Sequence, residues 1–331
     1  MSTPPIDAFA IERAAEVLRS GGIVALPTET VYGLAADADN EDAVRKLFTA
    51  KGRPADHPVI VHVGGADAFD DWAKEVSDDA RVLAGTFWPG PLTLVLRRGS
   101  RVRDVVTGGQ DTVGLRAPAH PWARAVLRAF GGALAVPSAN SFGRVSPTAA
   151  QHVIDDLGIK PRGKIDLVLD GGACPVGIES TIVDVSGTAP TLLRPGSITR
   201  DQLQRALGRP VTDAGADSPR ASGRLEKHYS PRTPLWVMPA DELAAKLAKP
   251  CNARLAVLAP LSLLENSRAD IALAIAAASD PDDYARLLYS SLHRLDASGA
   301  DRMLVAAPPD GSQWEAVRDR LRRAEAGTKT G

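Results

Sequence analysis

The chain has 331 residues, of which 44% are hydrophobic and 24% are charged, a composition typical of a globular protein with one large or two smaller domains. Its 39 Lys and Arg residues nearly balance its 40 Asp and Glu residues, so the net charge of −1 excludes a general electrostatic attraction to nucleic acid or acidic membranes. Its two widely separated cysteines, Cys174 and Cys251, exclude a disulfide framework and indicate a reducing, cytoplasmic environment.

The N-terminal residues carry no targeting signal that we can identify. They lack the basic start and apolar run of a signal peptide. No stretch of the chain approaches the roughly 18 consecutive apolar residues that are needed to span a bilayer. The sequence therefore predicts neither secretion nor insertion into a membrane.

The first 211 residues alternate between helical and extended patterns. The second predicted helix is the best delimited, because Asn40 is a suitable N-cap and Gly52 a suitable end. Helices are predicted over residues 7–22, 40–52, 78–87, 121–130 and 146–158, and strands over 23–27, 58–63, 92–98, 112–118, 133–137, 166–170, 180–185 and 191–196. Such alternation predicts an α/β domain with a mixed sheet.

Residues 212–234 differ in character from the segments on either side. They are rich in Gly, Pro, Ser and charged residues and show no periodicity, which predicts a linker or a lid. Alternation then resumes over residues 235–331, with strands expected over 235–238, 254–260 and 302–309 and helices over 241–249, 280–295 and 312–324. Asp280 and Pro281 form a typical helix start. This region is predicted to be a smaller, Rossmann-like α/β domain.

Cationic and hydroxyl side chains occur where several predicted strands of the first domain end. Ligands of open α/β sheets bind beyond the strand ends, so we expect these side chains to converge on an anionic ligand. The residues are Thr28, Glu29, Thr30, Lys51, Arg53, His57, His62, Arg116, Ser138, Asn140, Ser141, Ser146, Glu179, Ser180, Thr181 and Arg194. Each residue alone is more often structural, as an exposed ion pair, a core histidine or a turn hydroxyl. Their joint pattern is what indicates a site.

Common nucleotide and hydrolase motifs are absent from the sequence. There is no G-x-x-x-x-G-K-[ST] loop, no G-x-G-x-x-G turn, no H-E-x-x-H and no G-x-S-x-G. A nucleotide would therefore be held by side chains rather than by a glycine cradle.

The motifs PTETVYGLAAD, KGRP, VGLRAP, PSANSFGRVSPT, GIESTIVDV and LRPGSI occur in this order. Together they closely resemble the YrdC-like domain of the threonylcarbamoyl-AMP synthase family, over residues 8–207. The HYSPRTP linker and the C-terminal region resemble the two-domain members of that family. The resemblance implies a YrdC-like twisted mixed sheet with helices over residues 1–211, a linker or lid over 212–234, and an α/β domain over 235–331.

The resemblance also implies a reaction. ATP, L-threonine and bicarbonate would give L-threonylcarbamoyladenylate and pyrophosphate, with Mg²⁺ expected and no protein ligand set for it visible. A separate threonylcarbamoyl transferase would then modify the tRNA adenosine next to the anticodon. Direct binding of tRNA or of a membrane is not required, and a cytoplasmic location is expected.

Residue roles follow position by position from the same resemblance. Lys51 and Arg53 match the pair that faces the phosphates and would be the catalytic residues. The threonine-binding residues would be Thr30, His62, Arg116, Val136 through its backbone, and Ser180. The ATP-binding residues would be Arg53, His57, Thr112, Ser138, Asn140, Ser146, Arg194 and Tyr229 of the linker. Many relatives have Asn-Pro where this chain has His57-Pro58, so His57 departs from the family pattern.

Two other functions fit parts of the sequence. An RNA-binding module would use a basic concave surface, but the chain lacks a basic excess and aromatic residues interleaved with Lys and Arg. An O-carbamoyl transferase could contain the same domain, but such relatives carry zinc-finger, acylphosphatase or further catalytic segments that we do not find here. A salt-titrated RNA-binding assay would distinguish the first alternative from the synthase.

Overall fold

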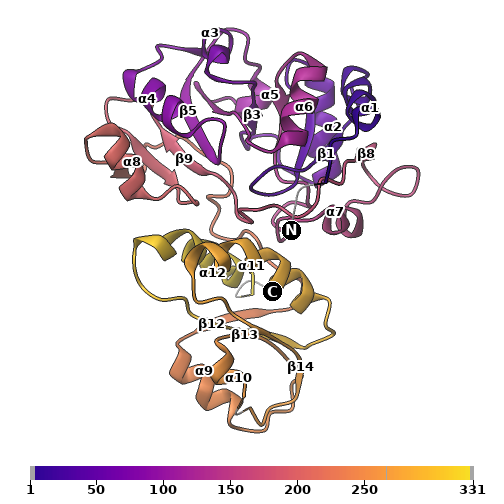
Figure 1. Ribbon diagram of the computed structural model, residues 1–331, viewed down its shortest axis with the longest axis vertical. Coiled ribbons are helices and arrows are strands. Elements are labelled where there is room, and N and C mark those ends of the chain that lie inside the picture. Colours follow the sequence, from indigo (N-terminus) through magenta and orange to yellow (C-terminus); the bar gives the residue numbers. More distant parts are fainter. Residues whose placement is uncertain (1–3, 266, 329–331) are drawn as a thin grey trace. The chain divides into compact units, whose positions relative to one another are not determined.

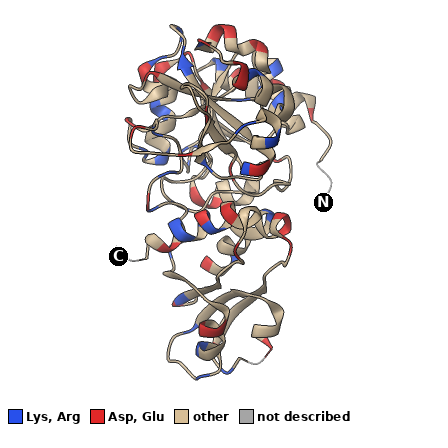
Figure 2. Ribbon diagram, turned by 90° about the vertical axis from the view of Figure 1, so that its left-hand side faces the viewer, with Lys and Arg blue, Asp and Glu red and all other residues tan. Residues whose placement is uncertain are grey.

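The computed structural model describes residues 4–265 and 267–328 and shows two compact units (Figure 1). The first unit comprises residues up to Phe142 and from Pro147 to Arg224. The second comprises residues 143–146 and the chain from Leu225 onward. The segment predicted as a linker, 212–234, is thus divided between the units after Arg224. In each unit Lys and Arg are interspersed with Asp and Glu along the ribbon (Figure 2).

The first unit is built on a mixed sheet of 11 strands. The strands are β1 (Val24–Leu26), β2 (Gly33–Asp37), β3 (Ile60–His62), β4 (Ala73–Lys74), β5 (Leu92–Arg98), β6 (Thr112–Arg116), β7 (Leu134–Ala135), β8 (Leu167–Val168), β9 (Thr181–Asp184), β10 (Thr191–Arg194) and β11 (Thr212–Asp213). Their order is β11-β10-β9-β5-β6-β3-β7-β2-β1-β8, with β4 paired to β5 outside this path. Parallel pairing of β3 with β6 and of β5 with β9 brings segments distant in sequence to neighbouring positions.

Helices cover this sheet, and five of the described ones lie within ranges predicted from the sequence. They are α1 (Ala8–Arg19), α2 (Glu41–Lys51), α3 (Phe69–Trp72), α4 (Asp78–Phe87), α5 (Asp104–Thr107), α6 (Pro121–Phe130), α7 (Ala150–Asp156) and α8 (Arg200–Leu207), with a 3₁₀ turn at Ala66–Ala68. The Asn40 side chain caps α2, and Gly52 ends it with a φ of 64°, a conformation that glycine adopts without strain. The predicted bounds of α2 are therefore confirmed.

The second unit has a parallel sheet of four strands with helices on its two faces (Figure 1). The strands are β12 (Leu235–Met238), β13 (Leu255–Ala259), β14 (Ile271–Ala276) and β15 (Arg302–Ala306), in the order β12-β15-β13-β14. The helices are α9 (Ala240–Leu247), α10 (Leu261–Leu264), α11 (Pro281–Asp296) and α12 (Glu315–Ala326), with a 3₁₀ turn at Ser312–Trp314. Asp280 caps α11 with Pro281 at its first position, as predicted. The α/β class of both units is confirmed.

Several elements were not predicted from the sequence, namely β2, β4, β11, β14, α3, α5, α8 and α10. Strand β2 has small residues and forms because it pairs with β1 and β7. Strand β14 alternates Ala with larger residues and pairs with β13. Helix α8 begins with a capping box of Thr199 and Gln202 that the sequence reading missed. Within the described ranges, no helix is long and apolar enough to cross a membrane.

Candidate functional site

Arg116, at the end of β6, is a buried cation held by contacts from separate loops. Its Nε donates to the Gly90 carbonyl at 3.3 Å and its Nη1 to Thr30 Oγ1 at 2.9 Å. Its Nη2 lies 2.7 Å from Oε1 of Glu29. Arg116 is 4% exposed and Glu29 6% exposed, so this ion pair is largely removed from water. These contacts fix the guanidinium and bring the predicted threonine-binding residues Thr30 and Arg116 together.

His62 lies at the end of β3, next to Arg116, and Val136 follows β7 on the other side of β3. Residues His62 and Arg116 are direct partners in the parallel pairing of β3 with β6. Burial and then the charge of Arg116 hold the pKa of His62 well below its usual value, so this imidazole is neutral at pH 7. The Val136 amide donates to the Ile60 carbonyl at 2.8 Å. A Cβ at Gly33 would lie 2.3 Å from the Val136 side chain, which explains the glycine at that position.

Lys51, the last residue of α2, is 3% exposed and is held by backbone carbonyls. Its Nζ donates to the Ser138 carbonyl at 2.6 Å and to the Asn140 carbonyl. Burial, and next the positive charge of Arg53, lower its pKa well below the usual value. Lys51 thus lies beside Ser138 and Asn140, two residues that the resemblance assigns to the nucleotide side.

Arg53 and Arg194 meet at a residue of the predicted linker. Arg53 Nη2 donates to Ser222 Oγ at 3.3 Å and to the Pro58 carbonyl at 2.7 Å. Arg194 Nη1 donates to the Ser222 carbonyl at 3.0 Å, and its Nη2 donates to Ser180 Oγ at 3.1 Å. Burial lowers the pKa of Arg53 to about 10, so it remains charged at pH 7. Two cations from distant motifs therefore share one small polar partner.

Residues 219–222, which we call the strap, cover a small pocket of the first unit. The Arg220 amide donates to Gln110 Oε1 at 2.6 Å, and Gln110 Nε2 donates back to the Arg220 carbonyl at 3.1 Å. The pocket is lined by Thr112 and by apolar side chains that include Ile60, Val95 and Ile182, with Arg220 and Ser222 on the strap side. The pocket therefore has an apolar floor with polar groups of the strap at its edge.

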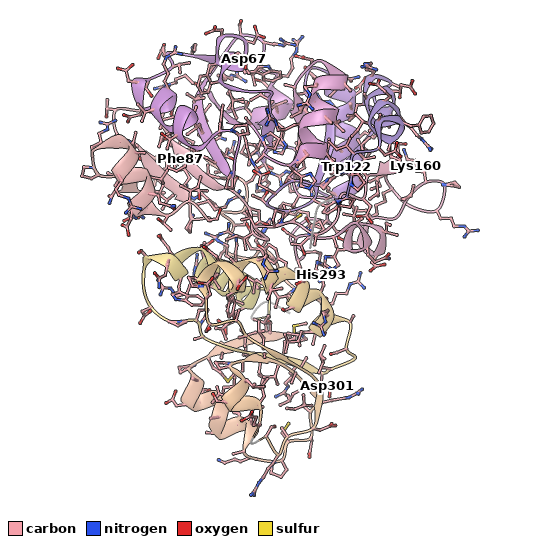
Figure 3. The ribbon with its side chains drawn as sticks, in the orientation of Figure 1. Asp67, Phe87, Trp122, Lys160, His293 and Asp301 are labelled. Atoms are coloured by element: carbon pink, nitrogen blue, oxygen red, sulfur yellow. The ribbon has the colours of Figure 1, made fainter. Side chains whose placement is uncertain are left out.

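Three predicted site residues, His57, Ser146 and Tyr229, do not take part in the contacts described above. His57 is half-buried, and its ring is tilted against that of Phe142 with centroids 5.3 Å apart. Burial and then the charge of Arg53 lower the pKa of His57. Ser146 belongs to the second unit, where its carbonyl lies 3.1 Å from Nε2 of His293 on α11. Figure 3 labels His293 on this helix. Tyr229 also belongs to the second unit. The nucleotide contacts of these residues stay predictions.

Tyr229 is buried in an aromatic cluster of the second unit. Its ring lies 5.6 Å from that of Tyr289, and the Arg320 guanidinium lies 5.4 Å from its centroid. Its φ of 60° is uncommon for a bulky residue and indicates that the surrounding packing holds this backbone conformation.

Sequence reasoning missed the partners of the predicted residues. The sequence motif contains Glu29 but does not indicate its role as the ion-pair partner of Arg116. Ser222 had no local signal at all. Thr93 was not identified, although its Oγ1 lies 2.8 Å from Ser180 Oγ. Their positions along the chain could not reveal these contacts, because the partners are 87 to 169 residues apart.

Comparison with known proteins identifies the family. A model of the Sua5, YciO and YrdC proteins, described as "Telomere recombination", matches residues 16–196, and a model of the C-terminal domain of threonylcarbamoyl-AMP synthase matches residues 198–326. The chain belongs to the Sua5/YciO/YrdC family. The recognition made from the sequence motifs is therefore confirmed.

Relatives and solved structures resemble the chain over nearly its whole length. The threonylcarbamoyl-AMP synthase of Pyrococcus abyssi is 36% identical over 326 residues, which cover 96% of this chain and 95% of that protein. That of Bacillus subtilis is also 36% identical, with 96% and 93% covered. The crystal structure of P. abyssi Sua5 complexed with L-threonine matches with a TM-score of 0.88 and 35% identity, covering 98% of this chain and 96% of the other.

Proposed function

We propose that this chain is a threonylcarbamoyl-AMP synthase, which converts ATP, L-threonine and bicarbonate into L-threonylcarbamoyladenylate and pyrophosphate. The observation that carries the proposal is the end-to-end similarity to curated synthases, at 36% identity over 96% of the chain. The product would be consumed by a separate threonylcarbamoyl transferase acting on the tRNA adenosine next to the anticodon. The cytoplasm, where such a transferase would act, is the expected location.

The cluster around Arg116 suits the amino-acid substrate. A guanidinium can bind the carboxylate of threonine through paired hydrogen bonds, and Thr30 and Ser180 supply hydroxyls for its polar groups. The neutral His62 adds a hydrogen-bonding group without a second positive charge. Val136 would contribute its backbone to the same pocket.

The cluster around Lys51 and Arg53 suits the triphosphate of ATP. The threonine amine first becomes a carbamate, whose oxygen attacks the α-phosphate in line while pyrophosphate leaves. No protein nucleophile is required, so the protein contributes orientation and compensation of negative charge. Lys51, Arg53 and Arg194 supply that charge. Thr112, Ser138, Asn140, His57, Ser146 and Tyr229 would complete the nucleotide side.

Mg²⁺ is expected to accompany ATP and to help neutralise the charge of its phosphates. Among the described residues, no group of three or more His, Cys, Asp or Glu side chains could hold a metal ion. Mg²⁺ at nucleotide sites is commonly bound by phosphates, waters and one or two carboxylates. This donor set fits a metal ion carried by the triphosphate, where it would neutralise phosphate charge.

Pyrophosphate release should require both threonine and bicarbonate. The carbamate is the nucleophile, and it cannot form if either component is missing. Pyrophosphate release would be monitored with a coupled phosphate assay, and the adenylate would be identified by mass spectrometry. Equal release without threonine would contradict the proposal. Serine should be used less well, since one missing methyl group in a pocket is worth about 1–3 kcal/mol.

Tyr229→Ala should weaken ATP binding if the predicted nucleotide contact of this residue forms. The expected loss is about tenfold, the value of one aromatic stacking contact. A direct ATP titration would measure the loss. The same titration would be made on a chain ended after Arg224, because the strap, which ends at Ser222, packs on the first unit. The shortened chain should show the same loss. If all proteins bind ATP alike, residues 225–234 only connect the units.

A further inference from the structure

The loop of residues 138–142, which we call the SANS loop, encloses Lys51. Its Ser138 and Asn140 carbonyls accept hydrogen bonds from Lys51 Nζ, the former at 2.6 Å. The Phe142 amide donates to the Lys51 carbonyl at 2.8 Å. No carboxylate of the described residues forms an ion pair with Lys51. The position of the ammonium group therefore depends on the conformation of this loop.

Asp156 ties the SANS loop to α7. Its Oδ2 accepts a hydrogen bond from the Ser141 amide at 2.6 Å, and its Oδ1 accepts one from Ser141 Oγ at 2.8 Å. Both carboxylate oxygens thus bind one residue, which lies between Asn140 and Phe142. Short hydrogen bonds to a carboxylate are stronger than those between neutral groups, so Asp156 restrains the middle of the loop.

The position of Asp156 is unfavourable for α7 itself. It is the last residue of the helix, where the macrodipole favours cations and disfavours carboxylates. The neighbouring Asp155 is exposed and accepts a hydrogen bond from Gln151 one turn earlier at 2.7 Å, an ordinary surface contact. Asp156 instead points its carboxylate at the SANS loop. A residue that breaks a local rule in this way is expected to have another role.

Asp156 also acts on Lys51 through its charge. The pKa of Lys51 is lowered first by burial and then by Arg53, whereas the negative charge of Asp156 raises it. Among the described residues, Arg53 and Asp156 are the charged groups that shift the pKa of Lys51. Without Asp156, the ammonium group would therefore lose its proton at a lower pH.

We propose that Asp156 is a positioning residue of the nucleotide site, which holds the SANS loop and through it the Lys51 ammonium in place for the triphosphate. The inference rests on the proposed function, in which Lys51 faces the phosphates of ATP. It adds a residue outside the recognised motifs, supplied by α7. Asp156 acts through Ser141 and Lys51 and need not touch the substrate.

The test compares Asp156→Asn with Asp155→Asn in the full-length protein. Asn keeps the shape of the side chain but removes the charge and weakens the bonds to Ser141. Equilibrium binding of ATP would be measured by calorimetry from pH 6 to pH 10. We expect about tenfold weaker binding for Asp156→Asn at pH 7.5, as for the loss of one charge-assisted hydrogen bond. The fall in affinity at alkaline pH should also begin at lower pH than in the wild type.

Asp155→Asn should bind ATP like the wild type at every pH, since its carboxylate lies on the surface. Ser141→Ala removes only the hydroxyl bond and should weaken binding severalfold without moving the alkaline fall, because the charge of Asp156 remains. Ser141→Ala also tests the inference if Asp156→Asn does not fold. Wild-type binding by Asp156→Asn, or by Ser141→Ala if that is the only folded variant, would overturn the inference. ATP binding is measured without threonine, so failure of the synthase assay is a separate result.

Discussion

Arg116→Ala should lower the free energy of unfolding by about 3–5 kcal/mol and abolish detectable use of threonine. The substitution leaves Glu29 buried at 6% exposure without the cation that lies 2.7 Å away. It also removes the group proposed to bind the threonine carboxylate. Chemical denaturation and the threonine KM of pyrophosphate release would measure the two effects. Arg116→Lys should recover part of the stability but little threonine binding, because it lacks the guanidinium fork.

A double variant separates folding from substrate binding. Glu29→Gln combined with Arg116→Ala removes both buried charges, so it should regain much of the lost stability and still fail to use threonine. Arg101→Ala is a matched control, because Arg101 is 44% exposed and its ion pairs with Asp39 and Asp71 lie at the surface. The control should change stability by less than about 1 kcal/mol. An unchanged threonine KM in Arg116→Ala would exclude the proposed carboxylate site.

Arg53→Ala should cost about 1.5–3 kcal/mol of ATP binding or transition-state stabilisation, which corresponds to roughly tenfold to a few hundredfold. Its guanidinium is buried, and it lies 5.8 Å from the ring of Phe48 and 5.7 Å from the ring of Phe142. These contacts hold the positive charge of Arg53 at the position where the triphosphate of ATP is expected. The measurement is kcat/KM for ATP at saturating threonine and bicarbonate. Arg53→Lys should rescue activity only in part.

The control for Arg53 comes from the same region of the chain. Arg45 lies on α2 at 60% side-chain exposure and pairs with Glu41 one turn earlier. Arg45→Ala should retain nearly wild-type kcat/KM, because an exposed pair of this kind contributes little. Near-normal turnover in Arg53→Ala would show that the phosphates bind elsewhere.

Much of the candidate site could be predicted because its residues lie in short motifs at strand ends. Thr30, His62 and Arg116 were predicted together, and the pairing of β3 with β6 and the contact of Thr30 with Arg116 bring them together. Lys51 and Ser138 are likewise in contact. The motifs could not reveal what neutralises or orients these groups. Glu29 lies in the same motif as Thr30, and Asp156 lies on α7, but the residues beside them do not indicate which cation each of them acts on.

Local sequence was sufficient for elements whose signals are local. The bounds of α2 and α11 follow from a capping side chain, apolar spacing and, for α2, a terminal glycine, all within a few residues of one another. Strands β2 and β14 contain small residues with weak intrinsic preference, and they form only because neighbouring strands supply hydrogen-bond partners. The chain's own sequence therefore determined the α/β class and the set of candidate residues. Tertiary structure decided which buried charges meet, since such pairing depends on distances between segments that are remote along the chain.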